Sequence, residues 1–211
     1  MEELYEIYNK IKSIIKKRLK EFKNKWKEGS EREIFAEFIF CLLTPQSKAK
    51  VCWRAVENIV SKNMLLKGKA DDIVRFLTGV RFKHKKASYI ILAREKFVVN
   101  KKLKIKEFLS KFDDVISMRE WLVKNIKGMG YKEASHFLRN IGFGKDIAIL
   151  DRHILKNLKV FNVIDKIPSS LSKKLYFEIE DKMRKFSNKI KIPMDELDLL
   201  LWYKEAGEVF K

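Results

Sequence analysis

The sequence holds few of the residues that form tight turns, cross-links and metal clusters. Its 211 residues include three prolines, eight glycines, two cysteines and a single glutamine. So little proline and glycine excludes a low-complexity or loop-rich protein. Cys41 and Cys52 lie in apolar stretches and are too few for a disulfide framework or a four-cysteine cluster. We therefore expect both to be buried thiols.

The sequence also lacks a long apolar run. No stretch approaches the roughly 18 apolar residues that a membrane-spanning helix needs. The first residues, Met1 to Tyr5, lack the basic and apolar regions of a signal peptide. We therefore expect a cytoplasmic protein with no membrane partner.

Positive charge is abundant. Lys and Arg number 47 against 28 Asp and Glu, which gives a formal net charge of +19. Solubility needs only a modest net charge, so the excess favours a polyanionic partner. The 15 Phe, 4 Trp and 6 Tyr exclude a disordered chain, because they supply ample apolar surface to bury. Basic runs such as 83–86 are interpreted as solvated faces, with a groove that follows the phosphates of a polyanion as the alternative.

Apolar residues recur at three- and four-residue spacing almost throughout, which is the helical period. The first stripe runs from Leu4 to Trp26 and ends at Gly29, and Ser30 with Glu33 forms a capping box for the next helix. Alternating hairpin patterns with Asn-Gly or Asp-Gly turns are absent. The sequence therefore predicts an all-α protein. The further helices are expected over 34–43, 48–61, 70–78, 85–97, 104–111, 114–126, 131–141, 147–159, 170–187 and 194–206.

Glycines are concentrated between positions 128 and 144. Gly128 and Gly130 separate a helix that ends near Ile126 from one that begins near Tyr131. We expect both glycines to take positive φ and to expose backbone N–H groups at a positive helix end, which forms an anion nest. With Lys127 beside them, they would bind a phosphate group without reading a base. The spacing of a Walker loop is missing.

This frame is the signature of a helix-hairpin-helix. The stretch 126–142 resembles one branch of the helix-hairpin-helix DNA glycosylase superfamily, the archaeal-type (second-type) 8-oxoguanine DNA glycosylase/lyases. The stretches 148–155 and 196–203 extend the resemblance, which covers essentially the whole chain.

The resemblance implies an all-α, two-lobed helix-hairpin-helix DNA glycosylase fold. The central helical lobe is expected over 39–144, with the hairpin motif at 126–142. The second lobe is expected to be discontinuous and to combine 1–38 with 145–211.

Lys132 lies in the first turn of the second hairpin helix. The helix dipole and nearby basic residues disfavour an ammonium there, and a lysine nucleophile needs a neutral amine. A lysine that contacts phosphate is the alternative from the residues alone. The resemblance implies that Lys132 is the catalytic lysine that forms a Schiff base.

Asp151 has apolar neighbours three and four positions away in the predicted helix 147–159. A lone carboxylate in that setting is either paired with Arg152 or His153 or is catalytic, and the residues alone do not decide between the two. The resemblance implies that Asp151 is catalytic. It would ease proton loss from Lys132 and stabilise the positive sugar as the base departs.

The resemblance also points to base-binding residues. Phe82 and Trp202 are expected to stack on the two faces of the base, and Lys211 to close the pocket. Trp202 follows three leucines, so core packing is the alternative for it. The loop 43–48 departs from the family and resembles the Pro-Gln turn of endonuclease III, where glutamine fills the gap left by the flipped nucleotide. Gln46 is therefore expected to contact DNA.

The function implied is that of a bifunctional enzyme, an 8-oxoguanine DNA glycosylase and AP lyase that acts as a monomer on double-stranded DNA containing oxidised guanine. No metal or other cofactor is expected. One alternative is an endonuclease III-like glycosylase for oxidised pyrimidines, motivated by Gln46 and its turn. Another is a non-catalytic helix-hairpin-helix protein that only binds DNA, motivated by net charge.

Overall fold

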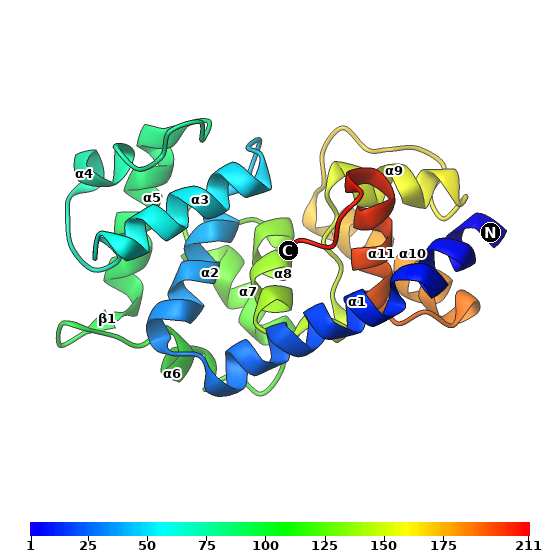
Figure 1. Ribbon diagram of the computed structural model, residues 1–211, viewed down its shortest axis with the longest axis horizontal. Coiled ribbons are helices and arrows are strands. Elements are labelled where there is room, and N and C mark those ends of the chain that lie inside the picture. The colour runs from blue at the N-terminus through cyan, green and yellow to red at the C-terminus, as the bar shows by residue number, and fades with distance from the viewer. The chain divides into compact units, whose positions relative to one another are not determined.

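The computed structural model describes residues 1–211, and eleven α-helices make up most of the chain (Figure 1). The all-α prediction is confirmed. The chain divides into two compact units, one contiguous over Lys25–Phe137 and one that combines Met1–Asn24 with Leu138–Lys211. The contiguous unit starts and ends earlier than the predicted lobe 39–144, and the predicted lobe bounds stay a prediction. No helix is both long enough and apolar enough to cross a membrane.

The contiguous unit is built around one helix, α2, that is buried on all sides. Every residue from Ile34 to Leu43 is buried, as expected of a helix that is apolar all round. Rings of α2 and neighbouring elements meet at its centre, with the Phe38 ring 5.4 Å from that of Phe97 and 5.3 Å from that of Phe137. The elements of this unit are α2 (Glu31–Leu43), α3 (Ala49–Ser61), α4 (Ala70–Val74), α5 (Lys83–Phe97), β1 (Val98–Val99), β2 (Lys102–Leu103), α6 (Ile105–Leu109), α7 (Val115–Asn125) and most of α8 (Tyr131–Asn140).

The predicted capping box at the start of α2 is confirmed. The Ser30 hydroxyl accepts from the backbone N–H of Glu33, and the Glu33 carboxylate accepts from the backbone N–H of Ser30 at 2.8 Å. Two orphan N–H groups of the first turn are satisfied in this way. The helix therefore begins close to where the sequence places it.

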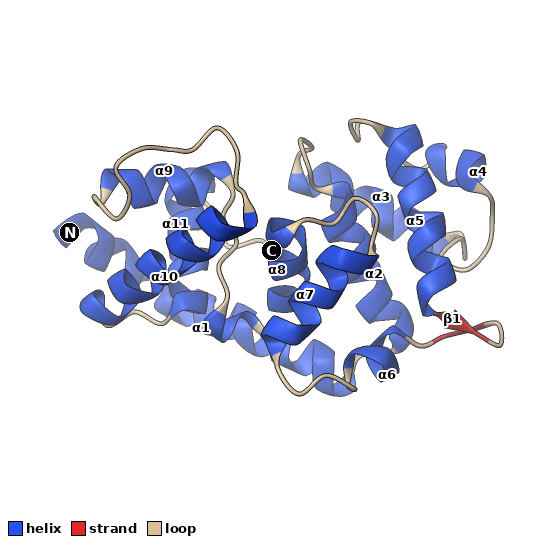
Figure 2. Ribbon diagram, turned by 180° about the vertical axis from the view of Figure 1, so that it is seen from behind, coloured by secondary structure: helices blue, strands red, loops and turns tan.

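The sequence-based expectation of no β-hairpin is wrong at one place. Val98 and Val99 pair with Leu103 and Lys102 as a short antiparallel ribbon, drawn in red in Figure 2. The two turn residues between the strands, at positions 100 and 101, both take positive φ, of 49° and 61°. That is the backbone of a mirror-image hairpin turn, formed here by Asn-Lys in place of the more common Asn-Gly.

The discontinuous unit has an equally enclosed helix, α11. Leu197, Leu199, Leu200 and Leu201 are all fully buried. The apolar stripe predicted for the first helix is confirmed at six of its eight members, which are buried, whereas Ile7 and Trp26 are half-buried. The elements of this unit are α1 (Glu2–Glu28) up to Asn24, the end of α8, the 3₁₀ turn η1 (Gly144–Asp146), α9 (Arg152–Val160), α10 (Lys173–Ile190) and α11 (Met194–Ala206).

Gly142 is the point where the chain after α8 comes closest to the backbone of α1. Its φ is +95°, and a Cβ there would lie 2.9 Å from the Cα atom of Lys23. Because the obstacle is backbone, it cannot rotate away as a side chain can. Gly207, which follows α11, also has a positive φ of +73°, but a Cβ there would meet nothing within 4 Å.

These two glycines predict different costs for the same substitution. Gly207→Ala should lower the free energy of unfolding by about 1 kcal/mol, the cost of a left-handed backbone in a residue with a Cβ. Gly142→Ala adds the clash with α1 and should cost about 3 kcal/mol or more. Denaturant unfolding of both variants measures the difference. Equal losses would show that backbone conformation alone, and not close packing, requires the glycine at 142.

Candidate active site

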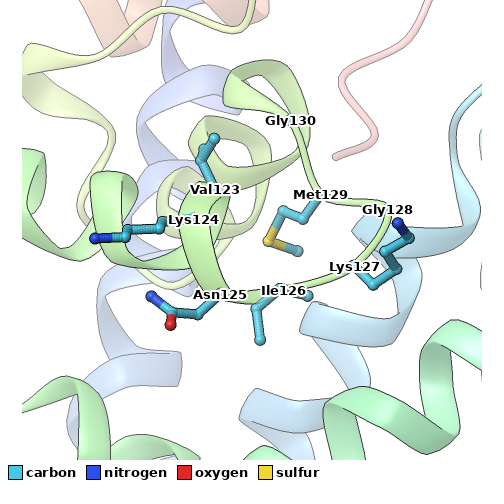
Figure 3. A pocket seen from close by; sticks show the side chains of 8 residues that line it. All are labelled: Val123, Lys124, Asn125, Ile126, Lys127, Gly128, Met129 and Gly130. Carbon is cyan, nitrogen blue, oxygen red and sulfur yellow. The ribbon is translucent and has the colours of Figure 1, made fainter.

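The sequence predicts a positive φ at both glycines of the hairpin between α7 and α8. The structure has it at one of them. Gly128 has a φ of +85°, and a Cβ there would lie 2.2 Å from Cδ2 of Tyr89. Ile126 and Met129 are buried beneath the turn (Figure 3). An open depression of about 470 Å³ is lined by residues 123–130, and the exposed Lys127 is part of its wall. A backbone site with two basic side chains, Lys124 and Lys127, suits a phosphate group.

The expectation of positive φ at Gly130 is wrong. Gly130 has an ordinary φ, and its N–H donates to the Glu133 carboxylate at 3.1 Å. Glu133 sits three residues after Gly130 at the start of α8, which is the spacing of a capping box. This N–H is therefore already bonded within the hairpin, and the expected nest has one donor fewer.

Lys132 lies in the first turn of α8, as predicted. Its Nζ atom is 3.2 Å from the Glu133 carboxylate, and a quarter of its side chain, 25%, is exposed. The ammonium is accessible yet held at a defined place. The sequence analysis missed Glu133, although its spacing from Gly130 is a signal that could have found it.

The two helices of the hairpin are fastened together by polar contacts. The fully buried Arg119 on α7 donates to the Ser135 hydroxyl on α8 at 3.1 Å. The Tyr131 hydroxyl donates to the Glu120 carboxylate at 2.9 Å. These bonds fix the start of α8, and with it the position of Lys132.

Gln46 lies exposed at the tip of a tight turn after α2. The Ser47 N–H donates to the Thr44 carbonyl at 3.0 Å, with Pro45 at the second position and Gln46 at the third. Gln46 has a φ of 54°. A proline followed by a residue with positive φ is typical of a type II turn, although glycine or asparagine is the usual third residue.

Phe82 is also exposed and also has a left-handed backbone. It precedes α5 with a φ of 56°, and 55% of it is accessible. The Arg81 guanidinium lies over its ring at 5.6 Å from the centroid. A large aromatic side chain exposed at such a backbone position is available to a ligand.

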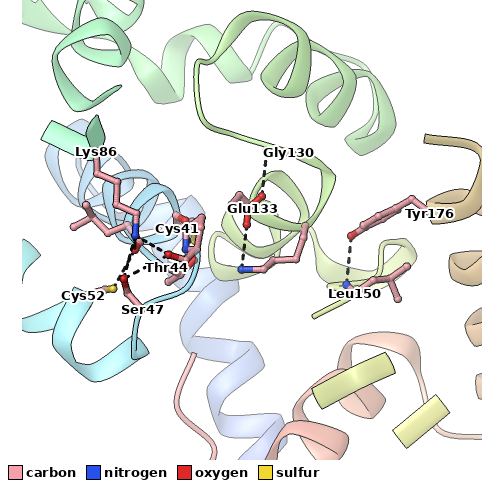
Figure 4. Close-up of polar contacts among 12 residues, drawn as sticks. Cys41, Thr44, Ser47, Cys52, Lys86, Gly130, Glu133, Leu150 and Tyr176 are labelled. Carbon is pink, nitrogen blue, oxygen red and sulfur yellow. Dashed lines mark hydrogen bonds and ion pairs between the residues drawn. The ribbon is translucent and has the colours of Figure 1, made fainter. Parts of the chain in front are cut away.

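Lys86 contradicts the interpretation of the run 83–86 as a solvated face. It is only 4% exposed, and its ammonium donates to the carbonyl groups of Leu43 and Pro45, both at 2.7 Å, and to the Ser47 hydroxyl at 3.1 Å (Figure 4). Burial lowers the pKa of Lys86. The run is therefore solvated at its start and turned inward at its end.

Cys52 lies near this buried ammonium. Its thiol contacts the Leu43 carbonyl at 3.3 Å, and burial raises its pKa to about 11. Cys41 and Cys52 are both buried, as predicted, and neither forms a disulfide. No group of three or more His, Cys, Asp and Glu side chains is arranged to hold a metal ion.

In the discontinuous unit, Asp151 is the N-cap of α9. Its Oδ1 atom accepts from the backbone N–H groups of His153 and Ile154, both at 2.8 Å. Neither of the predicted structural partners, the side chains of Arg152 and His153, is bonded to it. The carboxylate is held in place by backbone donors at the positive end of a helix.

The predicted helix over 147–159 is wrong in its first turn. Residues 147–150 are extended and buried, and α9 begins only after Asp151. The extended segment bonds to α10, where the Glu180 carboxylate accepts from the Ala148 N–H at 2.7 Å and the Tyr176 hydroxyl donates to the Ala148 carbonyl at 2.6 Å. These partners replace the bonds that a helix would supply.

Trp202 and Lys211 lie in the same unit as Asp151. Trp202 on α11 is half-buried, and its ring meets that of His153 edge to face at 5.0 Å. Its indole N–H is buried without a hydrogen-bond partner. Lys211 ends the short segment that follows α11 and is half-buried. Asp151, His153 and Trp202 are thus neighbours around the start of α9.

The comparisons agree with this geometry. The family model described as 8-oxoguanine DNA glycosylase matches residues 15–192. This chain belongs to that family. It is 54% identical over 209 residues to the 8-oxoguanine DNA glycosylase/AP lyase of Fusobacterium nucleatum, covering 99% of this chain and 96% of the relative.

Members of the family from archaea are similar over the same length. The 8-oxoguanine DNA glycosylase/AP lyase of Methanocaldococcus jannaschii is 42% identical, over 96% of this chain and 94% of the relative. The crystal structure of the M. jannaschii enzyme in complex with 15mer DNA containing 8-oxoguanine matches with a TM-score of 0.89 and 41% identity, covering 100% of this chain and 98% of that one. The predicted family resemblance and the helix-hairpin-helix glycosylase fold are confirmed.

One further charged pair lies close to Asp151 in this family member. The carboxylate of Asp198, on the enclosed helix α11, is 3.6 Å from Nε of Arg139, and both side chains are buried. Burial, with smaller contributions from the charges of Asp151 and Asp195, raises the pKa of Asp198 to about 6 against the opposing effect of Arg139.

This pair predicts a specific pH dependence of stability. Because the folded state raises the pKa of Asp198, its stabilising contribution is present below the unfolded pKa near 4 and is lost as the pH rises through about 6. Between pH 4 and pH 7 the unfolding free energy of wild type should therefore fall by about 2 kcal/mol relative to Asp198→Asn. Denaturant unfolding across this range measures it.

Asp181→Asn is the matched control. Asp181 is exposed, and its hydrogen bond with Lys185 lowers its pKa. The unfolding free energy of Asp181→Asn should therefore not rise relative to wild type as the pH increases. A pH-independent difference between wild type and Asp198→Asn would contradict the burial argument.

Proposed function

We propose that this protein is a bifunctional DNA repair enzyme that excises 8-oxoguanine from double-stranded DNA and then cleaves the abasic strand. The observation that carries the proposal is Lys132, an accessible lysine in the first turn of α8, directly after the glycine turn of a helix-hairpin-helix. The family of the chain and the names of its relatives agree with this activity.

The reaction begins when the damaged nucleotide leaves the stack, because C1′ cannot be reached within the duplex. The Lys132 amine forms a bond to C1′ while the bond between C1′ and the base breaks, and the base leaves with a proton. Loss of a proton from the lysine nitrogen and cleavage of the C1′–O4′ bond then give an imine and a 4′ hydroxyl group. This covalent intermediate is the Schiff base of a lysine nucleophile.

The imine makes the second activity possible. It withdraws electrons from C2′, so a C2′ proton is removed and the C3′–O3′ bond breaks by β-elimination. The strand is cut on the 3′ side of the lesion, and water later hydrolyses the imine and frees Lys132. We assign to Asp151 the role of easing proton loss from Lys132 and stabilising the positive sugar. Its carboxylate is suited to that role because backbone donors hold it at one oxygen only.

DNA binding rests on the hairpin and on net charge. Gly128 and Lys127 would bind a phosphate beside Gly130, whose N–H is already bonded to Glu133, and the net charge of +19 supplies a salt-sensitive attraction that does not depend on base sequence. Phe82 and Trp202 would stack on the extruded base, Lys211 would close over it, and Gln46 would fill the gap in the duplex. The monomeric state and cytoplasmic location stay predictions.

The principal test is covalent trapping. Wild-type protein mixed with duplex DNA containing 8-oxoguanine and reduced with borohydride should give a stable protein–DNA adduct. Lys132→Gln should give none, because it has no amine to form the imine. Lys96→Gln, an exposed lysine on α5, is the matched control and should trap as wild type does.

The choice of duplex separates the alternatives. Preferential trapping on thymine glycol would instead support a glycosylase for oxidised pyrimidines, the alternative that the turn at Gln46 motivates. The absence of an adduct with 8-oxoguanine, thymine glycol and abasic duplexes alike would reject both enzymes and leave a DNA-binding hairpin protein.

A second prediction concerns Asp151. Asparagine is also a good N-cap, so Asp151→Asn should keep α9 and the fold while removing the charge. We expect single-turnover excision to fall by about 10² to 10⁴, with DNA affinity nearly unchanged. Asp114→Asn is the control, because Asp114 caps α7 through the same pair of bonds, both 2.8 Å. Full activity of Asp151→Asn would reject a catalytic role.

A further inference from the structure

Lys86 is a buried charge that the proposed chemistry does not use. Its ammonium group has three hydrogen-bond acceptors, the carbonyls of Leu43 and Pro45 and the hydroxyl of Ser47, at 2.7, 2.7 and 3.1 Å. An ammonium has three donors, so its hydrogen-bonding capacity is filled. Pro45 and Ser47 belong to the turn that carries Gln46, and Leu43 is the last residue of α2 before it.

The position of Lys86 follows from the burial of α2. The last carbonyl groups of a helix have no partner within the helix, and here water does not reach them. The Thr44 hydroxyl donates back to the Cys41 carbonyl at 2.8 Å, and Lys86 supplies the donor for Leu43. The end of α2 and the turn after it are therefore held by one side chain from α5.

Ser47 extends these hydrogen bonds to the turn that carries Phe82. Its hydroxyl accepts from Lys86 and also from the backbone N–H of Arg81, at 3.0 Å. Arg81 is the residue before Phe82. A continuous path of hydrogen bonds thus joins the turn of Gln46 to the turn of Phe82.

Both turns need such support. Gln46 and Phe82 have φ of 54° and 56°, a backbone region that costs about 1 to 3 kcal/mol for residues other than glycine. Such conformations persist only where surrounding contacts hold them. Yet both side chains are exposed and make few contacts that could fix them, so the support must come through the backbone.

We propose that Lys86 is a positioning residue that holds Gln46 and Phe82 in the orientation needed to extrude and stack the damaged base, acting through Ser47 and the carbonyls of the turn. This inference rests on the proposed function, since it assigns Lys86 a part in base extrusion and not in the chemistry of Lys132. It predicts that the loss of Lys86 slows base excision much more than strand cleavage.

A competing account is electrostatic. The Lys86 charge acts on Lys132, and the Cys52 thiol does not neutralise it because burial keeps that thiol protonated. In that account the loss of the Lys86 charge would weaken excision and strand cleavage together and would shift the pH profile of strand cleavage.

The test compares two substrates under single-turnover conditions. Lys86→Met keeps the length of the side chain and removes its donors. Excision of 8-oxoguanine should fall by about 30- to 100-fold, as expected for a misplaced reacting group. Strand cleavage and borohydride trapping at a preformed abasic site, which has no base to extrude or stack, should change less than about threefold, with an unshifted pH profile.

Ser47→Ala provides an independent variant, because it removes the link at a partly exposed position and leaves Lys86 in place. It should lower excision more than strand cleavage, as Lys86→Met does, but by a smaller factor. The double variant should be no slower than Lys86→Met alone, since both substitutions break the same path. Lys96→Met, which removes an exposed charge from the same helix, should act as wild type.

The outcomes are distinct. Equal losses on both substrates, a shifted cleavage profile or unchanged excision would each overturn the proposal. If Lys86→Met does not fold, the proposal is tested on Ser47→Ala, by comparing its loss of excision with its loss of strand cleavage. Failure of the wild-type protein to excise 8-oxoguanine or to be trapped would instead reject the proposed function itself.

Discussion

The complete burial of α2 is the constraint on which the contiguous unit depends. A helix enclosed on all sides gains apolar packing along its length, but its terminal carbonyl groups then lose water as a partner. The chain resolves this with a threonine hydroxyl and a buried lysine, which donate to the last carbonyl groups of the helix. Because the same lysine also donates to the turn that follows, the packing of the core determines where that turn lies.

The discontinuous unit meets the same constraint differently. Its enclosed helix α11 begins with three buried acidic residues, Asp195, Glu196 and Asp198. Tyr8 on α1 donates to Glu196 at 2.6 Å, and burial together with that carboxylate raises the pKa of Tyr8. Arg139 at the end of α8 faces Asp198. Carboxylates near a positive helix end are favourable, and buried ones additionally need donors from other elements.

Much of this fold is predictable from local patterns. Helical periodicity, the capping box at Ser30 and the glycine turn at Gly128 each depend on residues a few positions apart, and the structure has them where the sequence places them. Lys132 and Asp151 were identified because of their local motifs. The structure places both at helix starts, and their assigned roles remain proposals.

The features that the sequence analysis missed depend on distant partners. The segment 147–150 has helical periodicity, but its backbone bonds to Tyr176 and Glu180, about thirty residues later, keep it extended. Lys86 looks like part of a basic surface run, yet its acceptors lie about forty positions earlier in the chain. No periodicity within a short window reports such contacts, because they exist only once the elements have packed.

The division of the chain also has a consequence for the order of events during synthesis. Residues 25–137 are contiguous, so the elements around α2 can pack as soon as that stretch has left the ribosome. The apolar stripe of α1 is made first but is covered by helices from 138–211, which are made last. The nascent protein therefore carries an uncovered amphipathic helix until translation ends, and this interval is when it is most exposed to chaperones and to aggregation.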